Sequence, residues 1–248
     1  MLFLNGSGAT LASMGMLISL FTDRFDVVAH DQRGLGETDV PPGPYTMADY
    51  AADALAVLDA VGWDRCRVIG VSFGGMVAQE LAVTAPERVE RLVLCCTSPG
   101  GDGGASYPLH ELAELPPAEA AALGTRLLDT RFDAEWLASH PADRGLAEMM
   151  AARRAEPKSD AQRRGEREQL HARAGHDVCA RLERVTCPTL VACGRYDGIA
   201  PLANGEAIAA RVPHAELRVY EGGHAFFGQD PQALRDLFDF LAAGAPAS

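Results

Sequence analysis

The sequence lacks a basic excess that would suit a polyanionic partner. Its 22 Lys and Arg residues stand against 34 Asp and Glu residues, which gives a formal net charge of -12. A chain this acidic repels nucleic-acid phosphates and anionic membranes unless a local basic patch compensates. Residues 151–184 carry nine basic and six acidic side chains, an excess too small and too interleaved for a nucleic-acid site. We therefore expect neither nucleic acid nor a membrane as a partner.

Paired cysteine motifs and long apolar runs are also missing. The six cysteines form no C-x-x-C pair and have no histidine partners at zinc-finger spacing. No apolar run reaches the 18 residues that a membrane span needs. The apolar N-terminus has no basic residue before Arg24, whereas a secretory signal begins with positive charge. These absences predict a cytoplasmic protein with reduced cysteines, no metal and no cofactor.

What is present is the composition of a globular chain with a regular alternation of elements. The 248 residues are 48% hydrophobic and 23% charged, enough for a large core. Apolar, β-rich runs predict strands at 2–4, 25–29, 67–71, 89–96, 189–193 and 216–220. Apolar residues at helical spacing predict helices at 10–21, 47–61, 75–85, 201–212 and 231–241. Strands that alternate with helices predict a parallel sheet covered on both faces.

The alternation is interrupted after residue 98. Gly100 to Gly104 is a glycine-rich linker, and the following eighty or so residues have helix-forming composition and no strand pattern. We therefore predict an α/β core at 1–98 and 187–248, with a helical cap insertion at 99–186.

A serine motif lies in the first part of the core. Gly70-Val71-Ser72-Phe73-Gly74 fits G-x-S-x-G, and such a short motif gains weight only from its context. Here the serine follows a predicted strand and precedes a predicted helix, the setting of a nucleophile elbow. The flanking glycines suit the strained turn. Ser72 is thus the candidate nucleophile, at the carboxyl edge of the sheet.

A serine hydroxyl needs a base to take its proton. His224 follows the strand at 216–220, so it should emerge at the same edge of the sheet as Ser72. His30 ends another predicted strand at this edge and is the second candidate.

The base in turn needs a carboxylate to orient it. Asp197 follows the strand at 189–193, and Asp102 is the alternative acid. The chain order Ser72, Asp197, His224 is one of the three common orders of a catalytic triad.

With these motifs in place, the chain resembles the capped single-domain α/β-hydrolases. It is most similar to 3-oxoadipate enol-lactonases, serine haloperoxidases and esterases, and C–C bond hydrolases. Besides the serine motif with its extension Gly75-Met76, the matching segments are Asp31-Gln32-Arg33-Gly34-Leu35-Gly36, Gly194-Arg195-Tyr196-Asp197 and Gly222-Gly223-His224. The resemblance implies an α/β-hydrolase fold with a helical cap. It also implies hydrolysis of a small ester or lactone, with Ser72 attacking, His224 relaying the proton and Asp197 orienting His224.

The same resemblance implies an oxyanion hole made of two backbone N–H groups. One comes from Phe73 and the other from Ser7, in the loop Asn5-Gly6-Ser7-Gly8. Asn5 stands where relatives usually carry histidine, but the donors are backbone groups, so the hole should survive. The candidate substrate-pocket residues are Asn5, Gly6, Trp136 and Phe226. For Trp136 and Phe226 packing is the alternative, and for Asp31 to Gly36 a structural turn fastened by Arg33.

Other functions remain compatible with this sequence. C–C bond hydrolysis and perhydrolysis use the same triad, and a hydrolase scaffold can also serve as a small-molecule binding protein without turnover. The arginines between Arg153 and Arg173, Arg163 and Arg164 among them, could recruit substrates that carry a carboxylate.

The position of the oxyanion loop also predicts the number of strands. This loop begins at Asn5, only a few residues into the sequence, whereas members of this group usually have two antiparallel strands before it. We therefore expect about six strands instead of eight and a start that is truncated relative to the group. An edge strand without a neighbour would be open to pairing in a homodimer.

Overall fold

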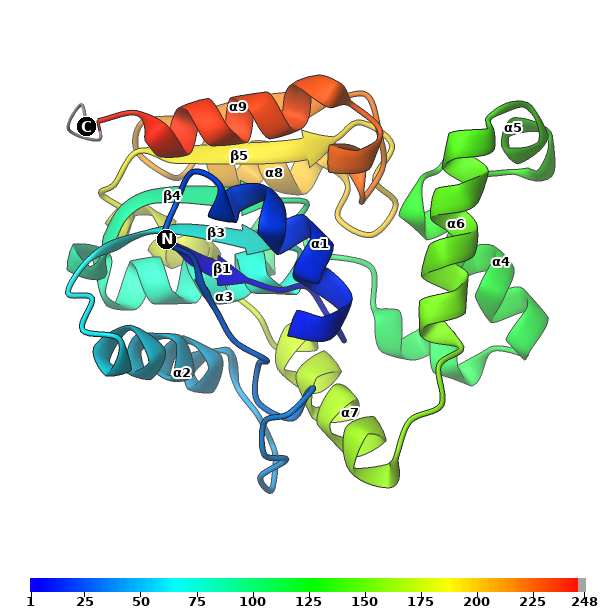
Figure 1. Cartoon of the computed structure of the whole chain (residues 1–248), viewed down its shortest axis with the longest axis horizontal. Helices are drawn as coiled ribbons and strands as arrows, with labels where there is room; N and C mark the ends of the chain where they lie inside the picture. Colours follow the sequence, from blue (N-terminus) through cyan, green and yellow to red (C-terminus); the bar gives the residue numbers. More distant parts are fainter. Residues whose placement is uncertain (245–248) are drawn as a thin grey trace.

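The computed structural model describes residues 1–244 and contains one six-stranded sheet in the order β2-β1-β3-β4-β5-β6. All five neighbouring pairs are parallel. The strands are β1 (Leu2–Leu4), β2 (Val28–Ala29), β3 (Cys66–Val71), β4 (Val89–Cys95), β5 (Thr189–Gly194) and β6 (Ala215–Tyr220). The expected number of strands and their direction are confirmed (Figure 1).

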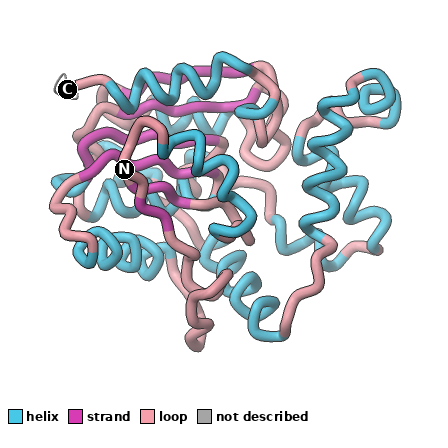
Figure 2. The backbone as a smooth tube through the Cα atoms, viewed as in Figure 1, coloured by secondary structure: helices cyan, strands magenta, loops and turns pink. Residues whose placement is uncertain are grey.

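Helices cover both faces of the sheet, as Figure 2 shows. On one face lie α1 (Leu11–Thr22) and α9 (Pro231–Ala242), and on the other α2 (Met47–Ala60), α3 (Phe73–Thr84) and α8 (Leu202–Ala209). Alternate residues of β1 supply the two layers: Phe3 packs with α1 and α9, whereas Leu2 and Leu4 pack with α2 and α3. This period of two is what a strand buried on both faces requires.

One edge of the sheet is shorter than the sequence predicted. Of the predicted strand at 25–29, only Val28–Ala29 forms β2. These two residues pair with Leu2 and Phe3 of β1. Within residues 1–244, β2 has β1 as its single neighbour. Two residues give few backbone groups to pair, which is one way in which native sheets limit edge-to-edge association.

The segment between β4 and β5 is helical. It contains α4 (Pro117–Leu128), α5 (Ala134–Ser139), α6 (Pro141–Arg154) and α7 (Asp160–Ala174), with short 3₁₀ turns at Gly101–Gly103, Leu109–Glu114 and Cys179–Arg184. Figure 1 shows α4, α5 and α6 beyond the ends to which the strands point. α7 begins with a capping box between Ser159 and Gln162. It brings the chain back towards the sheet.

No helix among residues 1–244 is long and apolar enough to cross a membrane.

Candidate active site

Ser72 occupies the turn between β3 and α3 in a backbone conformation that side chains rarely adopt, with φ 55° and ψ -115°. Its N–H donates to the Cys95 carbonyl oxygen at 2.8 Å. Its own carbonyl accepts from the Thr97 hydroxyl, also at 2.8 Å. Contacts on both sides thus hold the strained residue in place, as strain at a functional position requires.

The glycines around Ser72 are needed because backbone approaches them closely. A Cβ atom at Gly74 would collide with the Leu4 carbonyl, and one at Gly70 would collide with the Gly74 carbonyl. The G-x-S-x-G motif therefore allows α3 to begin directly against β1 and β3.

His224 connects the serine to a carboxylate. Its Nε2 atom lies 2.9 Å from Ser72 Oγ, and its Nδ1 atom lies 2.8 Å from Asp197 Oδ2. With the Nδ1 proton directed at Asp197, Nε2 is left to accept the serine proton. Ser72 is 7% exposed and Asp197 4%, so the hydrogen bonds are shielded from bulk water. The three residues that the sequence singled out lie together at the carboxyl edge of the sheet.

The Asp197 carboxylate is held by backbone as well as by His224. Its Oδ1 atom accepts the N–H groups of Ile199 and Ala200, both at 2.8 Å. Because Oδ1 is committed to these donors, Oδ2 faces the imidazole in a fixed orientation.

The end of α4 fastens the loops that carry the acid and the base. The His224 N–H donates to the Leu128 carbonyl at 2.7 Å, and the Gly198 N–H donates to the Leu127 carbonyl at 3.1 Å. The helical segment thus holds the Asp197 loop and the His224 loop in position at the edge of the sheet.

A buried carboxylate next to this junction extends the support. Asp129, fully buried, accepts two hydrogen bonds from the Arg131 guanidinium, and its Oδ2 atom also accepts from Gln229 Nε2 at 2.9 Å. Gln229 Oε1 accepts the Gly223 N–H at 2.9 Å. A continuous path of hydrogen bonds therefore runs from Asp129 to the residue before His224.

The loop after β1 lies against the serine. A Cβ atom built on Gly6 would be 3.5 Å from Ser72 Cβ. Among the described residues, the N–H groups of Ser7 and Phe73 have no hydrogen-bond acceptor, and the Phe73 N–H belongs to the first turn of α3. Two free donors beside a serine hydroxyl are the requirement for binding an oxyanion.

The four predicted pocket residues have different surroundings. Asn5 is fully buried and its side-chain amide has no partner within residues 1–244. Gly6 leaves room for no more than a Cβ atom in van der Waals contact with Ser72. Phe226 is also fully buried, but it stacks on Tyr220 at 5.1 Å in the core beside α9. Trp136 stacks on His140 at 3.8 Å. Its Nε1 donates to Asp143. These contacts are those that the packing alternative requires of Phe226 and Trp136, and the pocket role of all four residues stays a prediction.

The second-choice triad residues lie elsewhere. Asp102 is exposed in the 3₁₀ turn after β4. His30 is half-buried, and burial lowers the pKa of its imidazole. Neither is bonded to Ser72 or His224 within the described chain. Arg33 donates two hydrogen bonds to Asp53, in keeping with a structural turn at residues 31–36.

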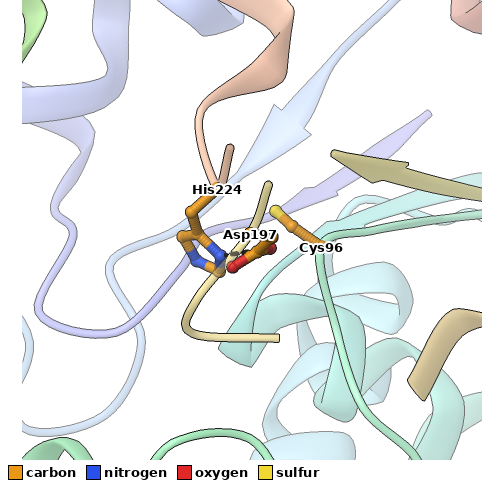
Figure 3. Close-up of side chains that lie close together, drawn as sticks. All are labelled: Cys96, Asp197 and His224. Atoms are coloured by element: carbon orange, nitrogen blue, oxygen red, sulfur yellow. Dashed lines mark hydrogen bonds and ion pairs between the residues drawn. The ribbon is translucent and has the colours of Figure 1, made fainter. Parts of the chain in front are cut away.

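Cys96, Asp197 and His224 bring three groups of metal-ligand type within 4.8 Å of one another (Figure 3). A metal ligand has to be deprotonated, whereas burial, and then the Asp197 charge, raise the pKa of the Cys96 thiol well above its usual value. Asp197 and His224 already bond each other. These three groups are therefore better described as a neutral thiol beside a hydrogen-bonded pair than as the ligands of a cation.

Two residues lie on the buried face of α7, and the first of them, Gln169, was not predicted from the sequence. Gln169 Oε1 accepts the Gly8 N–H at 2.7 Å and so fastens the loop after β1. Arg173, one helical turn later, is 6% exposed. The signal in the sequence is the spacing of the buried residues of α7, namely Gly165, Gln169, Ala172 and Arg173, which is the spacing of one helix face.

Comparisons with known proteins agree with the fold. The sequence profile of the α/β hydrolase fold matches residues 1–231. A Caulobacter segnis protein named as a carbamate hydrolase, RutD, is 29% identical over 244 residues, 96% of this chain and 89% of its own. The 3-oxoadipate enol-lactonase 2 of Acinetobacter baylyi is 28% identical over 94% of this chain and 85% of its own. The crystal structure of a hydrolase from Pseudomonas aeruginosa superimposes with a TM-score of 0.76 at 32% identity, over 98% of this chain and 89% of that one.

Proposed function

The chain belongs to the α/β hydrolase family and is a hydrolase, and we propose that it cleaves a small ester or lactone through an acyl-enzyme on Ser72. The observation that carries the proposal is the pair of hydrogen bonds made by His224, 2.9 Å to Ser72 Oγ and 2.8 Å to Asp197 Oδ2. A base that contacts both a serine hydroxyl and a buried carboxylate is arranged for general-base catalysis of nucleophilic attack.

In the first half of the reaction, the Ser72 oxygen attacks the carbonyl carbon while His224 Nε2 takes the hydroxyl proton. The resulting imidazolium is stabilised by the Asp197 charge. The carbonyl oxygen becomes an oxyanion, for which the Ser7 and Phe73 N–H groups are the candidate donors. When the carbon–oxygen bond to the leaving alcohol breaks, the imidazolium gives that alcohol its proton, and the acyl group stays on Ser72.

In the second half, water takes the place of the alcohol. His224 Nε2 accepts a proton from the water as its oxygen attacks the acyl carbon, and it then returns that proton to Ser72 Oγ as the ester bond breaks. The products are the free carboxylic acid and the original enzyme. Removal of one oxyanion donor in such a site typically costs 10²- to 10³-fold in rate.

The helical segment at residues 99–186 is part of the proposal, as a cap over the serine. The hydrogen bonds from His224 and Gly198 to the end of α4 support this assignment. So does the bond between Gln169 of α7 and Gly8. A cap that contacts the base, the acid loop and the oxyanion loop can exclude water and shape the substrate pocket.

A panel of substrates with matched serine variants tests the proposal. Short 4-nitrophenyl esters and small lactones are offered to the wild type, to Ser72→Ala and to Ser139→Ala, whose exposed serine lies at the end of α5. We expect turnover by the wild type and Ser139→Ala, and none above background by Ser72→Ala. No turnover of any ester or lactone by the wild type would overturn it.

Adding compounds with a scissile C–C bond, and hydrogen peroxide as an acceptor, to this panel separates the alternatives. Turnover only of compounds with a scissile C–C bond would indicate C–C hydrolysis, and ester turnover only with hydrogen peroxide as acceptor would indicate perhydrolysis. Binding of a ligand that survives unchanged, equally tight in Ser72→Ala, would indicate a binding protein.

A further inference from the structure

The loop between β1 and α1 carries a candidate oxyanion donor, and its peptide groups are held one after another. The Asn5 carbonyl accepts from Gln32 Nε2 at 2.6 Å. The Gly6 carbonyl accepts the Ala9 N–H at 3.2 Å, which closes a turn. In a trans peptide the N–H points away from the carbonyl, so this second bond also sets the direction of the Ser7 N–H.

The next two peptides of the loop are held by the helical segment. The Gly8 N–H donates to Gln169 Oε1 of α7 at 2.7 Å. The Gly8 carbonyl accepts from Arg153 Nη2 of α6 at 3.3 Å. Gly8 itself has φ 63°, and glycine takes φ of either sign. The turn therefore has little rigidity of its own, and the two side chains of the helical segment supply it.

The position of Gln169 is fixed by the way in which α7 meets the core. Gln169 is 1% exposed and lies one helical turn after Gly165. A Cβ atom at Gly165 would collide with the Gly34 carbonyl, so helix and core are in contact backbone to backbone there. In the turn that contains Gly34, the Asp31 carboxylate accepts the N–H of Leu11, where α1 begins, at 2.6 Å. The turn that supports α7 thus also holds the far end of the loop.

Small movements of this loop matter because it lies against the nucleophile. A Cβ atom built on Gly6 would be 3.5 Å from Ser72 Cβ, and Ser7 is the next residue. An oxyanion donor has to lie about 2.7–3.1 Å from the oxygen that becomes negative. A misplacement of about 1 Å in an active site can cost about 100-fold in rate. The side chains that hold the loop therefore affect the chemical step without contacting the substrate.

Resting on the proposed hydrolase function, we infer that Gln169 is a positioning residue for the oxyanion hole. Its Oε1 atom holds the Ser7–Gly8 peptide through the Gly8 N–H, and Arg153 supports the next peptide through the Gly8 carbonyl. Together they keep the Ser7 N–H directed at the oxygen that becomes negative. The helical segment then contributes to the rate of the chemical step as well as to substrate binding.

Two substitutions of Gln169 separate its acceptor atom from its size. Gln169→Met keeps the length and has no oxygen, whereas Gln169→Glu keeps an oxygen that can accept the Gly8 N–H. On 4-nitrophenyl butyrate we expect Gln169→Met to lower kcat about 10- to 100-fold, a part of the loss that follows removal of an oxyanion donor. KM should stay within about threefold, and Gln169→Glu should keep most of kcat. Arg167→Met, at an exposed position of α7, is the control and should change neither constant.

A trifluoromethyl ketone tests the same role without turnover. Ser72 Oγ adds to the ketone carbon, the serine proton passes to His224 Nε2, and the ketone oxygen becomes an oxyanion. The inhibition constant of trifluoromethyl butyl ketone should therefore rise in Gln169→Met by about the factor by which kcat falls. A raised KM with unchanged kcat and an unchanged inhibition constant would show that Gln169 only shapes the pocket, and would overturn the inference.

Arg153→Met decides the matter if Gln169→Met does not fold. It removes the donor to the Gly8 carbonyl, and we expect kcat to fall about 3- to 10-fold at an unchanged KM, as the loss of one hydrogen bond from a charged group does. An unchanged kcat would overturn the inference.

The outcomes distinguish the two proposals. If esters are cleaved with the same kcat by the wild type and Gln169→Met, or if Gln169→Met and Gln169→Glu lose kcat equally, the ester and lactone proposal stands and the role of Gln169 is overturned. If no ester or lactone is cleaved, but the ketone binds the wild type and Gln169→Glu more tightly than Gln169→Met, that proposal fails and the role of Gln169 stands.

Discussion

The Nε2 atom of His224 lies 2.9 Å from the Oγ atom of Ser72, although 152 positions separate the two residues in the chain. Serine comes from the turn after β3 and histidine from the loop after β6. The carboxyl ends of parallel strands meet at one edge of the sheet, so the fold itself brings the two side chains together. Asp197, from the loop after β5, completes the arrangement at the same edge.

Loss of the Asp197 charge should remove most of the turnover. Asp197→Asn can hold the imidazole in the wrong tautomer and cannot stabilise the imidazolium, so we expect kcat to fall by about 10³- to 10⁴-fold with a small change in KM. Steady-state kinetics on a 4-nitrophenyl ester measure this. Asp102→Asn, at the exposed alternative acid, is the control; a comparable loss there would refute the assignment of the acid.

Asp129 should stabilise both the fold and the position of His224. Asp129→Asn removes the charge that Arg131 and Gln229 share. We expect a loss of about 2 kcal/mol in the free energy of unfolding, below the usual range for buried pairs because Arg131 is partly exposed. We also expect a fall in kcat, because Gln229 is no longer held in place to accept the Gly223 N–H, and the position of His224 becomes less well fixed. Urea denaturation and kinetics are compared with Asp160→Asn at an exposed ion pair; equal effects of the two variants would contradict this role.

His176 should make the fold sensitive to mild acid. Burial lowers the pKa of its imidazole to about 4, below the value near 6.5 of an unfolded chain. The unfolded state therefore binds a proton first, and stability falls as the pH drops from 6.5 to 4, by up to about 1.4 kcal/mol per pH unit.

Urea denaturation at several pH values between 7.5 and 4.5 measures this slope. His176→Leu, which cannot titrate, should have a shallower slope than the wild type, and the exposed His171→Gln should keep the wild-type slope. An unchanged slope in His176→Leu would show that other groups, such as the half-buried His30, account for the acid sensitivity.

Chelation should leave the reaction intact. The Cys96 thiol is held neutral by burial, and Asp197 and His224 are bonded to each other, so the account requires no metal. We expect the same kcat/KM before and after dialysis against EDTA. A loss that added Zn²⁺ restores would contradict this expectation.

The fold and the three central residues could be predicted from the sequence for related reasons. Strands buried on both faces produce continuous apolar runs, such as the last four residues of β4, 92–95. The helices between the strands place their apolar residues at a spacing of three to four instead. Once the elements are placed in order, the rule that parallel strands share one carboxyl edge puts Ser72, Asp197 and His224 together. The glycines around Ser72 added a local signal with a steric cause.

The support around these residues could not be predicted in the same way. Gln169 and Asp129 act through the packing of the helical segment on the core, and nothing in their local sequence pattern indicates which loop they contact. Their roles depend on the tertiary position of α4 and α7.

The pattern of apolar residues in the sequence also does not distinguish core residues from pocket-lining residues. Phe226 and Trp136 are both aromatic residues close in sequence or in space to the His224 loop, and each is engaged in packing. A large apolar side chain satisfies either environment, so only its contacts decide.

The central claim is that His224 activates Ser72 for nucleophilic attack. The most direct measurement is reaction with a fluorophosphonate, followed by mass spectrometry of the labelled peptides. The account predicts one label per chain, on Ser72, with loss of ester hydrolysis in step with labelling, and labelling slowed by orders of magnitude in His224→Gln but not in His30→Gln. Full hydrolytic activity in a chain labelled at Ser72, or equally fast labelling in His224→Gln, would contradict it.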